Sequence, residues 1–119
     1  MTMTPFPDQH ELLTLFECEP VLADKDVPWC YNHLTFKTNR GSDQIVCEIM
    51  PSYHALKLAW TRDGQQLVSL DLNSVAGITL ELDGQTEAFT ATSRDENLAP
   101  LRVQLKPHVS VSWGTTIEP

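Results

Sequence analysis

The chain has 119 residues and a mass of 13.4 kDa, the size of one compact domain, so we expect a single domain over residues 1–119. Apolar residues make up 41% of the chain and charged residues 20%, values that exclude a chain disordered throughout. Eight lysine and arginine residues face sixteen aspartate and glutamate residues, and the net charge of −8 argues against nucleic acid as a direct ligand.

Residues 1–7 are predicted to be a flexible start. They contain neither a basic region nor an apolar run, so they do not read as a secretory signal, and the protein is expected to be cytoplasmic. Further along the chain, apolar runs such as residues 45–47 reach only three residues, whereas a membrane-spanning helix needs about 20. We therefore expect no membrane association.

A short helix is predicted over residues 8–18. Asp8 and Glu11 stand three positions apart, the spacing of a capping box in which each side chain accepts a hydrogen bond from the other residue's amide. Leu12 and Phe16, four positions apart, share one apolar face. A helix this short is marginal in isolation, so it is expected to pack on a sheet.

Residues 21–28 show no clear hydrophobic period and are predicted to be a connector. Residues 31–113 alternate between apolar and polar positions, which predicts about eight antiparallel strands in a hairpin meander, and residues 114–119 form a tail. The fold class is therefore mainly β (α+β), either a sandwich or a barrel. The strands are expected around Leu34 and Phe36; Ile45 to Ile49; Leu56 to Trp60; Val68 to Leu72; Ile78 to Leu82; Phe89 and Ala91; Leu101 to Leu105; and Val109 to Trp113.

Turn chemistry predicts the register of three hairpins. A three-residue loop over 62–64 and a two-residue loop over 83–84 each keep one face of the sheet apolar, as does an odd-numbered loop over 106–108. The predicted pairs are Leu58 with Val68, Leu56 with Leu70, Ile78 with Phe89, Ala76 with Ala91, Leu105 with Val109, Val103 with Val111 and Leu101 with Trp113.

No catalytic or metal-binding motif is apparent. Cys18, Cys30 and Cys47 are too widely spaced for a CxxC pair, and the four histidines match no zinc-binding spacing. The five glycines are spaced singly and form no phosphate-binding loop. We therefore expect a protein that is not an enzyme and uses no cofactor.

An aromatic segment preceded by acidic residues is the candidate partner-binding site. Tryptophan and tyrosine anchor many protein interfaces, and acidic side chains around them favour a basic partner. The same aromatic residues also suit the end of a sheet core, and the acids also suit a solvated face. The candidate site residues are Glu17, Glu19, Asp24, Asp26, Trp29 and Tyr31.

The layout of the chain resembles the small acidic immunity proteins of bacterial polymorphic toxin and contact-dependent killing systems. The resemblance lies in the short acidic domain, the leading helix with residues 12–16, the segment 17–20 with Glu17 and Glu19 that follows it, and the hairpins bearing Trp60 and Trp113. It implies a cytoplasmic protein that binds a cognate toxin tightly and blocks it without turnover. The acidic character suits a basic toxin domain.

Two other functions remain open at this point. Eight short antiparallel strands can close into a barrel that carries one small apolar ligand. A free sheet edge can instead pair with a second copy of the chain, which makes a homodimer or a structural oligomer.

Overall fold

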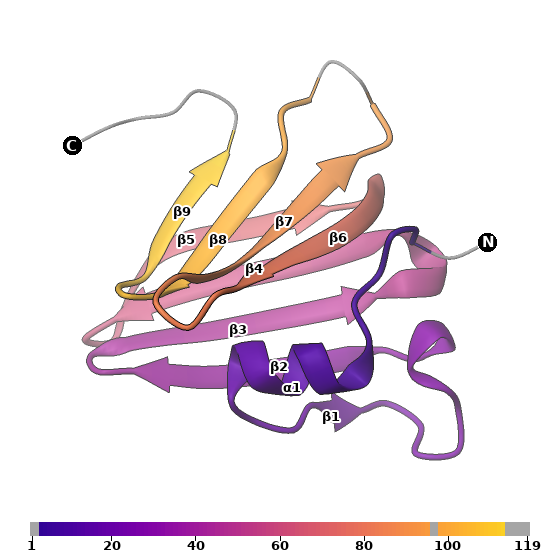
Figure 1. Cartoon of the computed structure of the whole chain (residues 1–119), viewed down its shortest axis with the longest axis horizontal. Coiled ribbons are helices and arrows are strands. Elements are labelled where there is room, and N and C mark those ends of the chain that lie inside the picture. The colour runs from indigo at the N-terminus through magenta and orange to yellow at the C-terminus, as the bar shows by residue number, and fades with distance from the viewer. Residues whose placement is uncertain (1–2, 96–97, 114–119) are drawn as a thin grey trace.

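The computed structural model describes residues 3–95 and 98–113, and within them the chain forms two antiparallel sheets (Figure 1). The strand order is β1-β2-β3-β4-β5 in the first sheet and β6-β7-β8-β9 in the second. The bounds are β1 Val21–Leu22, β2 Leu34–Arg40, β3 Asp43–Met50, β4 Ala55–Arg62, β5 Gln65–Leu72, β6 Val75–Leu82, β7 Glu87–Ser93, β8 Leu101–Lys106 and β9 Ser110–Trp113, with helix α1 at Gln9–Phe16 and 3₁₀ helices η1 at Trp29–Tyr31 and η2 at Pro51–Tyr53.

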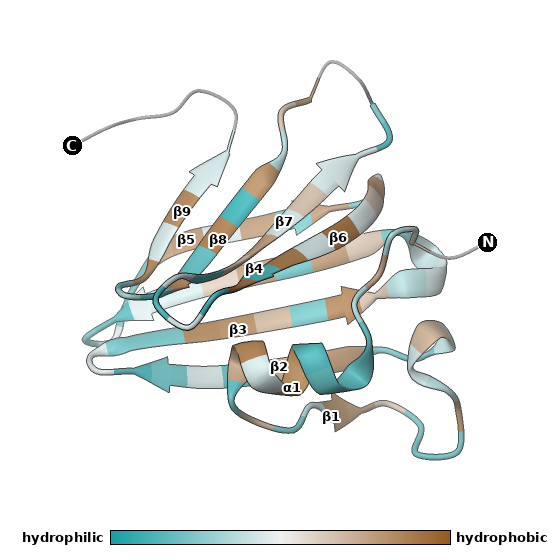
Figure 2. Cartoon of the chain, in the orientation of Figure 1, coloured by the Kyte–Doolittle hydropathy of each residue, from teal (hydrophilic) through white to brown (hydrophobic). Residues whose placement is uncertain are grey.

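The prediction of a mainly β fold with one N-terminal helix is confirmed. In the described residues the two sheets do not join into a closed barrel, because strands pair only within each sheet. The open sandwich is therefore the architecture, and the closed barrel on which the carrier hypothesis rested is not observed. Figure 2 shows the apolar stretches of β3, β4, β6 and β8 that supply the interior.

Helix α1 begins and ends at identifiable capping residues. The predicted capping box is confirmed: the Glu11 amide donates to the Asp8 carboxylate at 2.8 Å, and the Asp8 amide donates to the Glu11 carboxylate at 3.1 Å. The helix ends at Phe16, two residues earlier than predicted. Glu17 takes a left-handed conformation with φ of 56°, and its amide donates to the Leu13 carbonyl, which stops the helix there.

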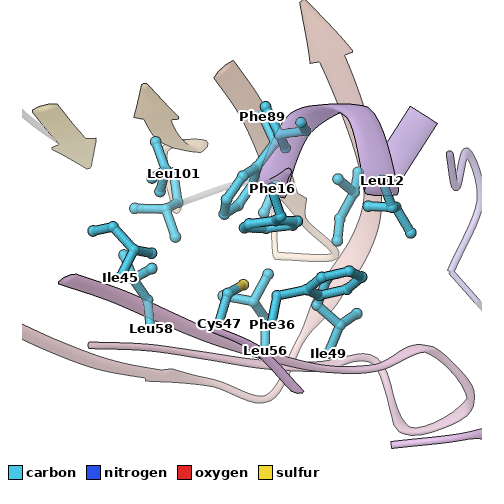
Figure 3. Packing of buried hydrophobic residues seen from close by; sticks show 14 of the residues in the cluster. Leu12, Phe16, Phe36, Ile45, Cys47, Ile49, Leu56, Leu58, Phe89 and Leu101 are labelled. Carbon is cyan, nitrogen blue, oxygen red and sulfur yellow. The ribbon is translucent and has the colours of Figure 1, made fainter. Parts of the chain in front are cut away.

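The core lies between the two sheets and is completed by α1 (Figure 3). The Phe16 side chain is fully buried, and its ring stacks on that of Phe36 in β2 with centroids 4.3 Å apart. The Phe16 ring also lies 6.1 Å from that of Phe89 in β7, a strand of the second sheet. A single helical side chain therefore joins both sheets, which is why this short helix is stable on its sheet.

The N-terminal segment is bound to β6, so the prediction of a flexible start is wrong for the residues described. The Thr4 amide donates to the Ala76 carbonyl, and the Ile78 amide donates to the Pro5 carbonyl, both at 2.8 Å. Met3 is 2% exposed and belongs to the core. Because only residues 3–5 take part in this pairing, the sequence shows no hydrophobic period there from which it could be predicted. Residues 1–2 lie outside the described part of the chain.

Gly77 allows this close approach, because a Cβ atom there would lie 2.6 Å from the backbone of Thr4 and Pro5. We expect Gly77→Ala to displace the N-terminal segment and to lower the free energy of unfolding by about 1–3 kcal/mol, the usual cost of overpacking. Urea denaturation of the variant and its parent measures the loss. An unchanged transition midpoint would contradict the contact between this segment and β6.

The segment 21–28 is more than the predicted connector. Val21 and Leu22 form the edge strand β1 and pair with Thr35 and Leu34 of β2. Two residues are too few to show a period of two, which is why the strand escaped prediction. The β body also begins at Leu34 rather than at residue 31, because residues 29–31 form η1.

The predicted register of the β4–β5 hairpin is wrong. Leu58 faces Leu70, and Leu56 faces Leu72. The turn is the two-residue type, with Asp63 and Gly64 both at positive φ, and a bulge after Trp60 inserts the extra residue that realigns the apolar rows. Sequence reasoning instead predicted an extra loop residue, Arg62, whereas the structure has the extra residue in β5, at Leu67.

The predicted register of the β6–β7 hairpin is also wrong, while that of the β8–β9 hairpin is confirmed. Ile78 faces Ala91 because the loop has four residues, 83–86, in which the Asp83 carboxylate accepts hydrogen bonds from the amides of Gln85 and Thr86. In the last hairpin Leu101 faces Trp113 and Val103 faces Val111, as predicted, while the predicted pair Leu105 and Val109 lies beyond the last paired residues, Gln104 and Ser110. The predicted tail, residues 114–119, lies outside the described residues.

Candidate partner-binding surface

The structure places Glu17 at one end of β2 and Asp24, Asp26, Trp29 and Tyr31 at the other, while Glu19 lies between them, just before β1. Glu17 lies beside Arg40, the last residue of β2. Asp24 is hydrogen-bonded to Asn32, which lies two residues before the start of β2. Seven strand residues span about 20 Å. Glu17 therefore does not share a surface patch with Asp24, and the two residues have different environments.

Glu17 belongs to an ionic latch, the group Glu17, Arg40, Glu87 and Lys106. The Lys106 ammonium lies 2.8 Å from the Glu17 carboxylate and 3.5 Å from the buried carboxylate of Glu87. The Arg40 guanidinium lies 3.8 Å from Glu17 and donates to the Leu15 carbonyl at 2.8 Å. The latch therefore ties the end of α1 to β2 and to β8, one strand from each sheet.

The latch shifts the pKa values of its charged groups in opposite directions. The hydrogen bond from Lys106, and the nearby charge of Arg40, hold the pKa of Glu17 below its ordinary value. The hydrogen bond to Glu17, and the Glu87 charge, raise the pKa of Lys106 above its ordinary value. The stabilisation from Glu17 is thus complete above the roughly 4.3 of an unperturbed glutamate and is lost as the pH falls through its lowered pKa.

We expect Lys106→Met to lower the free energy of unfolding at neutral pH and to have a smaller effect at acidic pH. The reason is that a protonated Glu17 no longer attracts the ammonium group. Urea denaturation at pH 7 and pH 3 measures the difference at each pH. Lys37→Met, at an exposed position of β2, is the control. An equal loss at both pH values would contradict the role of the ion pair.

Asn32 organises the loop that carries Asp24 and Asp26. Its side chain is buried, donates to the carbonyls of Asp24 and Val27, and accepts from the amides of Asp24 and His33. Sequence reasoning missed this residue, because a single asparagine in a polar stretch gives no sign of burial. Its four hydrogen bonds hold the loop in one conformation, so the two exposed carboxylates are presented from a defined backbone.

The two aromatic candidates differ in exposure. Trp29 is half-buried and packs edge-to-face on Phe36, with ring centroids 6.1 Å apart, so it completes the core at this end of the sheet. Tyr31 is 65% exposed. η1 contacts η2, on which Tyr53 is 78% exposed. Sequence reasoning did not select Tyr53, since only the tertiary contact of the two 3₁₀ helices brings it to the same end as Tyr31.

Five exposed acids lie on elements that share one flank of the molecule. Helix α1, β1 and the loop after β1 lie at the same edge of the sandwich, and the first turn of α1 is hydrophilic (Figures 1 and 2). Among the residues described, none of the acids on this flank makes a salt bridge, and Lys25 lies among them. We call this group the acidic flank: Asp8, Glu11, Glu19, Asp24 and Asp26, all exposed.

Metal binding has no assembled site in the part of the chain described, and one of the three thiols is shielded from solvent. No cluster of three or more His, Cys, Asp or Glu side chains is present there. Cys47 is fully buried, and burial raises the pKa of its thiol well above the ordinary value. The described residues also include no helix that is both long enough and apolar enough to span a membrane.

No protein-family model matches the sequence, and no curated protein matches it either. Among solved structures, the fold resembles a chain of the contact-dependent growth inhibition toxin–immunity protein complex from Klebsiella pneumoniae 342. The TM-score is 0.80 at 14% sequence identity, and the likeness covers 96% of this chain and 98% of that one. The resemblance predicted from the sequence is therefore confirmed at the level of the fold.

Proposed function

We propose that the protein is a non-catalytic binding module of the immunity type, which inhibits a cognate toxin by covering its surface. The observation that carries this proposal is the likeness in fold, over nearly the whole chain, to a chain of a toxin–immunity protein complex. The net charge of −8 also indicates the kind of partner, because an acidic protein favours binding to a basic toxin domain.

The proposed contact surface is the acidic flank together with Tyr31 and Tyr53. Exposed tyrosines bury a large area at little entropic cost and are enriched in the energetic centres of protein interfaces. Carboxylates around them accelerate encounter with a basic surface. Glu17 is left out of this surface because its charge is compensated within the latch. Trp29 is left out as well, because it is half-buried and packs on Phe36.

Protection of growing cells tests the proposal. Bacteria that inducibly produce the protein encoded next to this chain's gene, tested as the candidate toxin domain, are grown with and without this chain. We expect the chain to restore viability and to elute with the toxin domain as a 1:1 complex. Growth arrest that persists at full expression of the folded chain, with separate elution of the two proteins, would contradict the proposal.

A further inference from the structure

The four sheet edges of the described residues differ in how they are covered. β1 has only two residues, and β9 has four. β6 is covered where the backbone of residues 3–5 pairs with Ala76 and Ile78. β5 has eight residues, and the described residues hold no strand paired to its outer side. A long uncovered edge presents a row of unpaired backbone donors and acceptors to another chain.

The side chains of β5 also lack the neighbours that their partners on β4 have. Leu58 on β4 is 2% exposed, whereas Leu70, which faces it, is only partly buried. Leu67 is 45% exposed beside the bulge. Natural edge strands are commonly protected by lysine or proline, and β5 contains neither. Its single charged residue is Asp71.

From these observations we propose that β5 pairs antiparallel with β5 of a second copy of this chain, centred on Leu70, and joins two five-stranded sheets into one. The edge is self-complementary in this register. Leu70 meets its own copy, Val68 meets Leu72, and the apolar row that faces the core continues across the junction. On the opposite face Asp71 meets Ser69, so no like charges stand opposite each other.

Charge gives this dimer a salt dependence opposite to that of the proposed toxin complex. Each copy carries a net charge of −8, so the two copies repel each other at long range and added salt screens that repulsion. Dimer formation is therefore expected to strengthen as the salt concentration rises. Binding of the acidic flank to a basic partner is expected to weaken under the same change.

Sedimentation velocity of the full chain over a concentration series, at low and high salt, tests the pairing. As the protein concentration increases, the mean mass is expected to rise from 13.4 kDa towards twice that value. In high salt this rise is expected to begin at a lower protein concentration than in low salt. A mass that stays at that of the monomer at every concentration would overturn the inference. The proposed function would be untouched, because it is read out by protection against the toxin.

Two substitutions at exposed Ser69 test the register. Ser69→Asp places an aspartate opposite Asp71 at two points of the junction and is expected to weaken dimerisation by roughly 2- to 30-fold. Ser69→Lys places a lysine opposite Asp71 at the same two points and is expected to strengthen dimerisation by a similar factor. Thr79→Asp and Thr79→Lys, at an exposed position of β6, control for net charge alone. Ser69 variants that behave like the Thr79 variants of the same charge would overturn the proposed pairing.

Discussion

Replacing Phe16 by alanine is expected to lower the free energy of unfolding by about 3–5 kcal/mol, which is typical of a deleted core aromatic. The Phe16 ring is fully buried, stacks on Phe36 of the first sheet and packs against Phe89 of the second. Its loss leaves a cavity where the helix meets both sheets. A small domain has a stability of only about 5–15 kcal/mol, so the loss is a large part of the total.

Chemical denaturation followed by tryptophan fluorescence measures the effect. Val21→Ala is the matched control, because Val21 is 71% exposed and is expected to change stability by no more than about 0.5 kcal/mol. A Phe16→Ala protein that unfolds at the same denaturant concentration as its parent would show that α1 does not close the core. That result would contradict the sandwich described above.

Replacing Tyr31 by alanine is expected to weaken binding of the toxin domain by about 2 kcal/mol, or roughly 30-fold in Kd, mainly through faster dissociation. Tyr31 is 65% exposed in the free protein, so its removal should leave folding nearly unchanged. Tyr53→Ala is expected to have the same sign of effect, since η1 and η2 are in contact. Surface plasmon resonance separates the two rate constants.

Charge reversal at Asp24 and Asp26 provides the contrasting kinetic result. Lysine at both positions is expected to slow association, most strongly at low salt, with little change in dissociation. Leu98→Ala, at another exposed apolar residue, is the control for Tyr31. Rate constants unchanged by both Tyr31→Ala and the charge reversal would remove this surface from the proposed function.

Much of the local structure could be predicted from residue spacing. Asp8 and Glu11 marked the start of α1, because a capping box depends on side chains three positions apart. The alternating apolar residues located eight of the nine strands among the residues described, since the pleat places every second side chain on the same face. The β8–β9 register also followed from its short turn.

The candidate site could be predicted only in part. Asp24, Asp26 and Tyr31 lie exposed at one end of the sheet, whereas Glu17 lies about 20 Å away in the latch. Nothing in the spacing of Glu17 distinguishes a free carboxylate from one paired with Lys106, because these residues are far apart in sequence. Tyr53 was missed for the same reason.

The sequence by itself determined the strand periodicity, the capped helix and the acidic balance, because each depends on residue types or on neighbours within a few positions. Only the tertiary structure decided how the sheets stack, where the bulge falls in β4–β5, and that residues 3–5 cover β6 while the described residues leave β5 open. Those outcomes depend on contacts between distant segments. Such contacts form only when burial of the shared core repays the entropy of bringing the segments together.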